Sequence, residues 1–257
     1  GGGIHVDQSE LSMVRSNVTA NTVEGLSPSL RPGSLGGHGG GLALVGINAT
    51  LAMTRGIIRG NSALGAIDSF GGGVFISGGS VRLDGVVIES NVANATANAF
   101  GGGLANGGGS LSHLWGGDLT MAQGRITRNL ALATATRAEG GGLDNAHPTS
   151  TTTLDGVVVD SNVAEARGRA FGGGIKNFGT LQVPRTNVTN CSALGLTGSY
   201  GGGLYNVAVL LMGPHSVVQD NHIAPGEWQG REYFNGGEWT YVLPMPKGRW
   251  LSASHVA

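Results

Sequence analysis

The sequence predicts an all-β protein that folds as a right-handed parallel β-helix, a solenoid of about seven coils with a Trp- and Pro-rich C-terminal segment. Three observations support this prediction. The triplet Gly-Gly-Gly recurs at spacings of 29 to 39 residues, starting at positions 1, 39, 71, 101, 140, 172 and 201. Short β-branched runs of alternating polarity follow, separated by Gly, Asn and Asp, which is typical of strands and turns. Glycine makes up 49 of 257 residues, and each would cost a helix interior about 1 kcal/mol.

Each repeat is expected to contain three short strands. The first follows the triplet, as in "GLAN", the second holds an apolar pair, as in "VRL" from Val81, and the third ends at an Asn, as in "VVIES" from Val86. A unit of about 30 residues cannot bury its apolar side alone and must stack on its neighbours. We therefore expect one coil per triplet, with like strands paired in parallel about 4.8 Å apart.

Two apolar rows recur at fixed places and are expected to fill the interior. The second residue of the apolar pair is Met13, Met53, Leu83, Met121, Leu154, Val183 and Met212. The β-branched residue five positions further on is Val18, Ile58, Ile88, Ile126, Val159 and Val188, with Val218 after one inserted residue.

A third row is polar and is expected to form a structural ladder inside a turn. It consists of Asn21, Asn61, Asn91, Asn129, Asn162, Cys191 and Asn221. An inward Asn can hydrogen-bond both the backbone and the Asn of the next coil. Cys191, the only cysteine, occupies this row, so we interpret it as a small buried thiol rather than a nucleophile.

The triplet is expected to let the chain return from a variable excursion that precedes it, with a positive φ where required and a close approach of backbones. An aromatic residue precedes four triplets: Phe70, Phe100, Phe171 and Tyr200. These rings are expected to cover the glycines and to stack between nearby coils.

The quoted repeats "GGGLANGG…DLTMAQGRITRNLA" and "GGGIKNFGTLQVPRTNVTNCSA" resemble those of right-handed parallel β-helix proteins of the large cell-surface or secreted type. They are more distantly similar to the chlamydial polymorphic outer-membrane proteins. This resemblance covers residues 1–223 and implies a stalk, passenger domain or adhesive surface. Residues 243–250 resemble an element that follows such repeats in surface proteins of unicellular algae. The resemblance implies an extracellular or cell-surface location.

Composition narrows the function classes. Charged residues make up 12% of the chain, the formal net charge is −1, and there is no Lys/Arg run, which argues against nucleic acid or an anionic membrane as a partner. No segment approaches the roughly 18 consecutive apolar residues of a membrane-spanning helix. The seven His have no ligand-like spacing, so the sequence predicts no metal and no cofactor.

The aligned acidic residues are too far apart to act as paired catalytic carboxylates. Asp84 aligns with Asp155 and Glu89 with Asp160, but each pair is two coils apart, about 10 Å, which is too far for an acid and a nucleophile on one bond. Arg59 aligns with Glu89 one coil away, which predicts a surface salt bridge.

The row after the triplets is expected to face outward, and it has no neighbouring acids. It reads His5, Ala43, Phe75, Ala105, Asp144, Lys176 and Tyr205. Asp144 and Lys176 are adjacent in it and are interpreted as a structural ion pair.

Five Asn-x-Ser/Thr sequons make N-glycosylation a hypothesis, conditional on a eukaryotic secretory source. The candidate acceptors are Asn17, Asn48, Asn94, Asn187 and Asn190.

The domain prediction is a repeat domain at residues 1–223 and a cap or linker to further domains at 224–257, which holds three of the four Trp. We expect a non-enzymatic structural, adhesive or scaffold segment of a larger surface protein. The alternative is a carbohydrate-active lyase, hydrolase or epimerase, or a carbohydrate-binding module, with its site on excursions at 24–38, 113–118 or 137–139. Expected partners are other proteins or further β-helix coils of the same chain, because Gly1 opens inside a repeat. Carbohydrate is a further candidate partner.

Overall fold

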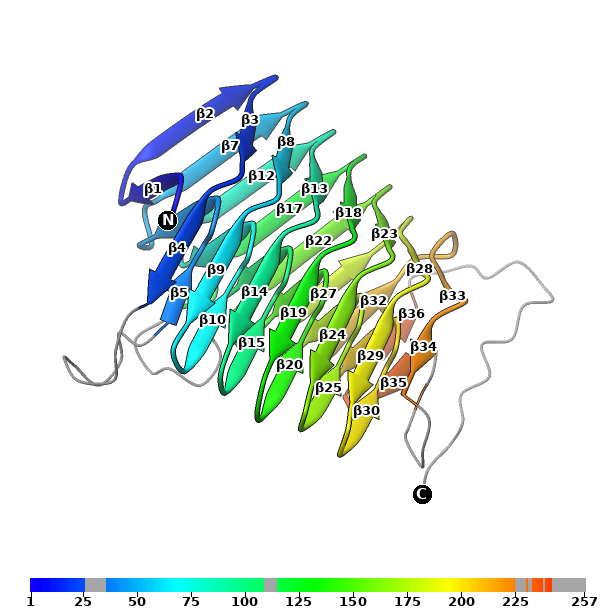
Figure 1. The fold of residues 1–257 in the computed structure, drawn as a ribbon. Coiled ribbons are helices and arrows are strands. Elements are labelled where there is room, and N and C mark those ends of the chain that lie inside the picture. The colour runs from blue at the N-terminus through cyan, green and yellow to red at the C-terminus, as the bar shows by residue number, and fades with distance from the viewer. Residues whose placement is uncertain (26–35, 109–114, 225–229, 231–232, 238, 242–257) are drawn as a thin grey trace.

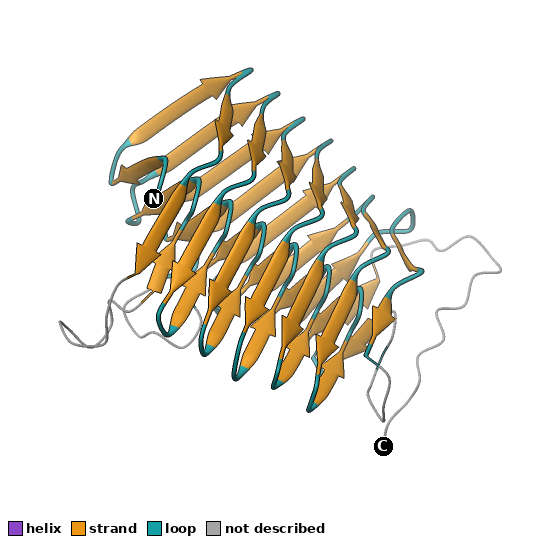
Figure 2. Ribbon diagram, viewed as in Figure 1, coloured by secondary structure: helices purple, strands orange, loops and turns teal. Residues whose placement is uncertain are grey.

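The protein is a stack of short parallel strands (Figure 1). This computed structural model describes residues 1–25, 36–108, 115–224, 230, 233–237 and 239–241. Over those residues every regular element is a β-strand, as Figure 2 shows, and the strands form five sheets with parallel pairing throughout. The predicted all-β parallel β-helix is therefore confirmed.

Sheets A and B contain the strands that follow the triplets and the strands of the apolar pairs. Sheet A comprises β1 (Ile4–Asp7), β6 (Leu42–Val45), β11 (Val74–Ser77), β16 (Leu104–Asn106), β21 (Leu143–Asn145), β26 (Ile175–Asn177), β31 (Leu204–Asn206) and β35 (Tyr233–Asn235). Sheet B comprises β2 (Glu10–Val14), β7 (Thr50–Thr54), β12 (Ser80–Asp84), β17 (Asp118–Ala122), β22 (Thr151–Asp155), β27 (Thr180–Val183), β32 (Val209–Met212) and β36 (Trp239–Tyr241).

Sheet C contains the strands that lead into the Asn row, sheet D those that leave it, and sheet E those that lead into the triplets. Sheet C comprises β3 (Asn17–Thr19), β8 (Ile57–Arg59), β13 (Val87–Glu89), β18 (Arg125–Thr127), β23 (Val158–Asp160), β28 (Asn187–Thr189) and β33 (Val217–Gln219). Sheet D comprises β4 (Thr22–Gly25), β9 (Ser62–Gly65), β14 (Val92–Ala95), β19 (Leu130–Ala133), β24 (Val163–Ala166), β29 (Ser192–Gly195) and β34 (His222–Ile223). Sheet E comprises β5 (Gly36–His38), β10 (Asp68–Phe70), β15 (Asn98–Phe100), β20 (Arg137–Glu139), β25 (Arg169–Phe171) and β30 (Gly198–Tyr200).

The main core consists of inward residues of sheets A, B and C. The β-branched row is confirmed, because every member pairs with the next one from Val18 through to Val218. All of its members are buried, and Ile58, Ile88, Ile126 and Val159 have no exposed surface. Burying each such side chain contributes about 1.5–3 kcal/mol, so repetition of one apolar position in every coil supplies much of the driving force for stacking.

Sheets D and E form a second pair of facing sheets, which the sequence did not predict. A complete repeat therefore contains five strands instead of the expected three. The segments before the triplets are paired strands rather than variable excursions. A separate core of small side chains lies between these two sheets. It consists of Ala93, Ala95, Ala99, Ala131, Ala133, Ala138, Ala164, Ala166, Ala170 and Ala193.

Glycines in the triplet connect sheet E to sheet A, and they have two different roles. Gly101 has a φ of 62°, a left-handed conformation that is costly for residues with a Cβ. Gly102 has no such φ, but a Cβ there would overlap backbone atoms of Leu130 on β19 and of Gly141 in the next triplet. The first glycine therefore makes the turn, and the second permits the close approach of backbones.

The repeat continues into the segment that the sequence assigned to a cap or linker. Strands β35 and β36 pair with β31 and β32 and so extend sheets A and B. Whether the remainder of 224–257 acts as a cap stays a prediction, because Trp228, Trp250 and the whole 243–250 element lie outside the described residues. Most of the 24–38 excursion and the start of the 113–118 excursion also lie outside them. The 113–118 segment follows the triplet at 101–103 in its coil, whereas the excursions were expected to precede the triplets.

Candidate functional site

The polar row inside the turn between sheets C and D is a hydrogen-bonded ladder. From Asn21 to Asn162, each side-chain amide donates from Nδ2 to Oδ1 of the Asn in the next coil, at 2.9 to 3.0 Å. Each Oδ1 also accepts the backbone N–H of the preceding Asn at 3.0 Å. Nδ2 of the interior members donates in addition to a carbonyl of sheet C, such as Ile88 O for Asn129 at 3.0 Å. The ladder thereby satisfies backbone groups that the turn buries.

Cys191 stands in this ladder with no exposed surface. Asn162 Nδ2 lies 3.8 Å from its Sγ, and its own N–H donates to Asn221 Oδ1 at 2.9 Å. Burial raises the pKa of the thiol to about 12. The thiolate needed for nucleophilic chemistry is therefore strongly disfavoured at this position.

A second Asn ladder, which sequence reasoning did not identify, ends the strands of sheet A. Its members are Asn106, Asn145, Asn177, Asn206 and Asn235, and their amides are joined from Nδ2 to Oδ1 at 2.6 to 3.2 Å. The signal was present in the sequence, because the third residue after the triplet is Asn in "GLAN", "GLDN", "GIKN" and "GLYN".

The five sequon asparagines are not equally accessible. Asn17, Asn48, Asn187 and Asn190 are exposed, whereas Asn94 is half-buried on β14. Asn190 Nδ2 donates to Asp160 Oδ1 at 2.8 Å. Exposure is compatible with a glycan at four of these positions, and glycosylation itself stays a prediction.

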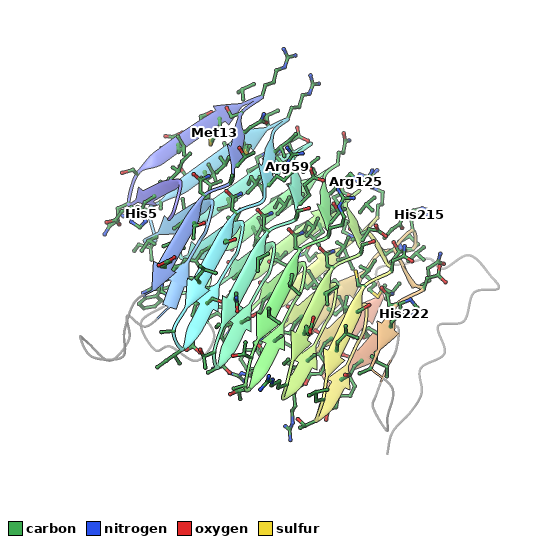
Figure 3. The ribbon with its side chains drawn as sticks, viewed as in Figure 1. His5, Met13, Arg59, Arg125, His215 and His222 are labelled. Atoms are coloured by element: carbon green, nitrogen blue, oxygen red, sulfur yellow. The ribbon has the colours of Figure 1, made fainter. Side chains whose placement is uncertain are left out.

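Acidic residues on sheets B and C take part in surface ion pairs. Asp84 is separated from Asp155, and Glu89 from Asp160, by one intervening strand in each row, as expected. Arg59, labelled in Figure 3, lies 3.5 Å from Glu89, which confirms the predicted salt bridge. A second arginine, Arg128, contacts the same carboxylate at 2.6 Å. Pairs of this exposed kind contribute about 0–1 kcal/mol.

The row after the triplets aligns as predicted, but it is not an exposed surface. Its strand register runs from His5 through Asp144 and Lys176 to Tyr205. Its middle members are buried, because the last residue of each sheet E strand covers them. Phe70 and Phe100 stack on each other at a centroid distance of 4.7 Å, and Phe171 and Tyr200 at 5.1 Å.

In one coil the covering residue is Glu139 instead of an aromatic ring, and this brings two acids together. Lys176 Nζ lies 2.9 Å from Glu139 Oε2 and 3.2 Å from Asp144 Oδ1. Arg137 Nε lies 3.2 Å from Glu139 Oε1. The row after the triplets itself has no two neighbouring acids, as expected, and the second carboxylate comes from a different sheet. We call Glu139, Asp144 and Lys176 the acid–lysine cluster.

The acid–lysine cluster is almost completely removed from solvent. Glu139 is 5% exposed, Asp144 0% and Lys176 8%. Desolvation raises the pKa of Asp144 to about 7, against the opposing effect of the Lys176 ammonium. Lys176 has its pKa raised: burial disfavours its charge, but the two carboxylates favour the charge more strongly. At neutral pH the cluster therefore holds a cationic lysine beside a carboxyl group that is close to its titration point.

A surface cavity of about 260 Å³ opens over the cluster. Its lining includes the charged side chains of Arg137, Glu139 and Lys176. Its aromatic walls are Phe100, Phe171, Phe178 and Tyr205. Apolar walls with a few convergent polar groups are typical of small-molecule sites, which makes this cavity the candidate functional site.

Over the described part of the chain, no three His, Cys, Asp or Glu side chains gather as metal ligands. The same residues include no helix that is long and apolar enough to cross a membrane. Comparisons with protein-family models, curated proteins and solved structures find no match to this chain.

Proposed function

We propose that this chain is a rigid, non-enzymatic solenoid segment with a structural, adhesive or scaffold role in a larger extracellular or cell-surface protein. The supporting observation is the unbroken strand register of all five sheets, which repeats the same buried positions coil after coil. In such a solenoid each coil packs on its neighbours, so additional coils lengthen the domain and keep the same packing between coils.

Two measurements test this proposal. Antibodies against the chain should label the surface of intact, non-permeabilised source cells. The purified chain, incubated with polygalacturonate and alginate, should release no unsaturated or reducing ends. Steady product formation that is lost in Glu139→Gln but retained in Glu89→Gln would instead establish an enzyme.

The cavity favours carbohydrate binding as a second candidate function. Its aromatic rings offer flat apolar faces, and Arg137 and Lys176 offer donors to hydroxyl or carboxylate groups. Titration calorimetry with uronic acid oligosaccharides should then show saturable binding that Arg137→Ala weakens. Arg128→Ala is the matched control, because Arg128 is a surface arginine whose carboxylate partner lies on sheet C. Equal affinities of the two variants would contradict binding in this cavity.

A further inference from the structure

The acid–lysine cluster has an unusual electrostatic arrangement for a structural ion pair. Asp144 is fully buried, yet its Oδ2 has no polar partner among the described residues and its Oδ1 meets only the lysine. A buried carboxylate with a single polar partner is costly, because the desolvation penalty of an ion in a protein interior is several kcal/mol. The buried ion pair between Asp144 and Lys176 is therefore an unfavourable arrangement in a folded protein.

The strand register holds the two reactive groups together without further movement of the chain. Asp144 on β21 and Lys176 on β26 are direct partners in adjacent coils. The amine nitrogen lies 3.2 Å from Oδ1 of Asp144, so it is next to the carboxyl group whose carbon, Cγ, it would attack. Holding two reacting groups together lowers the activation free energy of their reaction, because their translational and rotational entropy is already lost.

The surroundings cover Asp144 completely and supply a proton acceptor. Ala105 and Tyr205 flank the pair within sheet A, and Phe100 and Phe171 flank Glu139 within sheet E. Phe178 lies against the ammonium, 5.3 Å from nitrogen to ring centroid. Asp144 has no exposed surface, and a carboxyl group that is removed from water favours condensation over the reverse hydrolysis.

We propose that Lys176 and Asp144 condense spontaneously to form an intramolecular amide bond, with Glu139 as the catalytic proton-transfer group. The bond would tie two consecutive coils covalently through their side chains. It goes beyond the proposed scaffold function and does not depend on it.

The reaction balances without any other reactant. Glu139, as a carboxylate, takes one proton from the Lys176 ammonium. The free amine then attacks Cγ of Asp144, which is a neutral carboxylic acid, and the C–N bond forms. Glu139 passes its proton to the Asp144 hydroxyl and takes one from the nitrogen. The C–O bond breaks, one water leaves, and the products are a neutral amide and a neutral Glu139.

The charges facing Asp144 are consistent with this starting state. Burial and the Glu139 carboxylate raise its pKa, whereas Lys176 and Arg137 lower it, and the resulting pKa is about 7. Near neutrality a large fraction of Asp144 is therefore the neutral acid that the amine requires. The amide product replaces two buried charges by one neutral group, which relieves the cost of desolvation.

Intact mass spectrometry of the full chain tests the proposal directly. The purified wild-type protein is expected to be lighter than its sequence by one water. A tryptic digest should contain peptide 138–167 joined to peptide 170–185, with no cleavage after Lys176. A wild-type mass equal to that of the sequence after prolonged incubation would overturn the proposal, and so would a link to Glu139 in place of Asp144.

Variants distinguish the amide bond from other reactions that lower the mass by one water. Asp84-Gly85 and Asp155-Gly156 can also lose water by succinimide formation, so the deficit must disappear in Lys176→Met. Glu139→Gln should slow formation at least about 100-fold, the usual minimum for loss of a general base. Glu89→Gln, which changes a carboxylate on sheet C, should retain the wild-type rate. Formation at the wild-type rate in Glu139→Gln would refute the role of Glu139.

Discussion

Replacing Asn129 by alanine tests whether the first Asn ladder stabilises the fold through buried backbone groups. Asn129 Oδ1 accepts the N–H of Asn91, and its Nδ2 donates to the carbonyl of Ile88, each at 3.0 Å. Asn129→Ala leaves the buried N–H of Asn91 without a partner, whereas the carbonyl of Ile88 stays in the parallel pairing of β13 with β18. One unsatisfied group costs about 1–3 kcal/mol, so the free energy of unfolding should fall by about 1–3 kcal/mol.

Urea denaturation followed by circular dichroism measures this loss, with Asn17→Ala as the control. Asn17 is exposed on β3, and its replacement should change stability by less than about 0.5 kcal/mol. Repeat proteins can unfold in parts, so hydrogen exchange at the Asn91 amide supplies a local measurement. That amide should exchange faster in Asn129→Ala. A loss no larger than that of the control, with the amide still protected, would refute the reasoning.

Three further predictions concern the turn, the thiol and the acid–lysine cluster. Gly102→Val should abolish the strand signal in circular dichroism, because the valine side chain would overlap backbone atoms. Gly60 has a positive φ but open space around it, so Gly60→Ala should lower the free energy of unfolding by only about 1–2 kcal/mol. Equal effects of the two variants would contradict this. Cys191→Asn should raise the free energy of unfolding by about 1 kcal/mol, because it restores an amide to the ladder, and a lower urea midpoint would contradict it. In protein refolded from urea, the amide bond should form about 100-fold more slowly at about pH 9 than at about pH 6. The reason is that Asp144, with a pKa of about 7, loses its proton over that interval. Equal rates of formation at the two pH values, measured by mass spectrometry, would contradict this prediction.

The positions of sheets A, B and C could be predicted from sequence because their inward residues are large and β-branched. Ile58 and Ile88 show the same position in consecutive coils, and only a parallel stack places them together. Sheets D and E were missed for the opposite reason. Their buried residues, such as Ala93 and Ala138, are small and have low strand propensity, so the segments read as loops. The folded chain buries them because a layer of methyl groups lets two sheets approach closely.

The acid–lysine cluster could be predicted only in part. Asp144 and Lys176 occupy the same row, and the sequence placed them in neighbouring coils. Glu139 belongs to another row, and its approach depends on how the chain turns at Gly140, which has a φ of 60°. Comparison within single rows cannot detect a contact between two sheets. Prediction of the complete cluster therefore requires the three-dimensional positions of its side chains, and the sequence alone does not give them.

The hydrogen bonds of the two Asn ladders all point the same way along the stack. In both, Nδ2 of one coil donates to Oδ1 of the coil that follows it in sequence. The amide dipoles therefore add, much as peptide dipoles add along an α-helix, and the two ends of the stack are electrically unlike. A coil reversed end over end would set donor against donor and acceptor against acceptor. Any lengthening of this solenoid, by its own chain or by another copy, must therefore proceed head to tail.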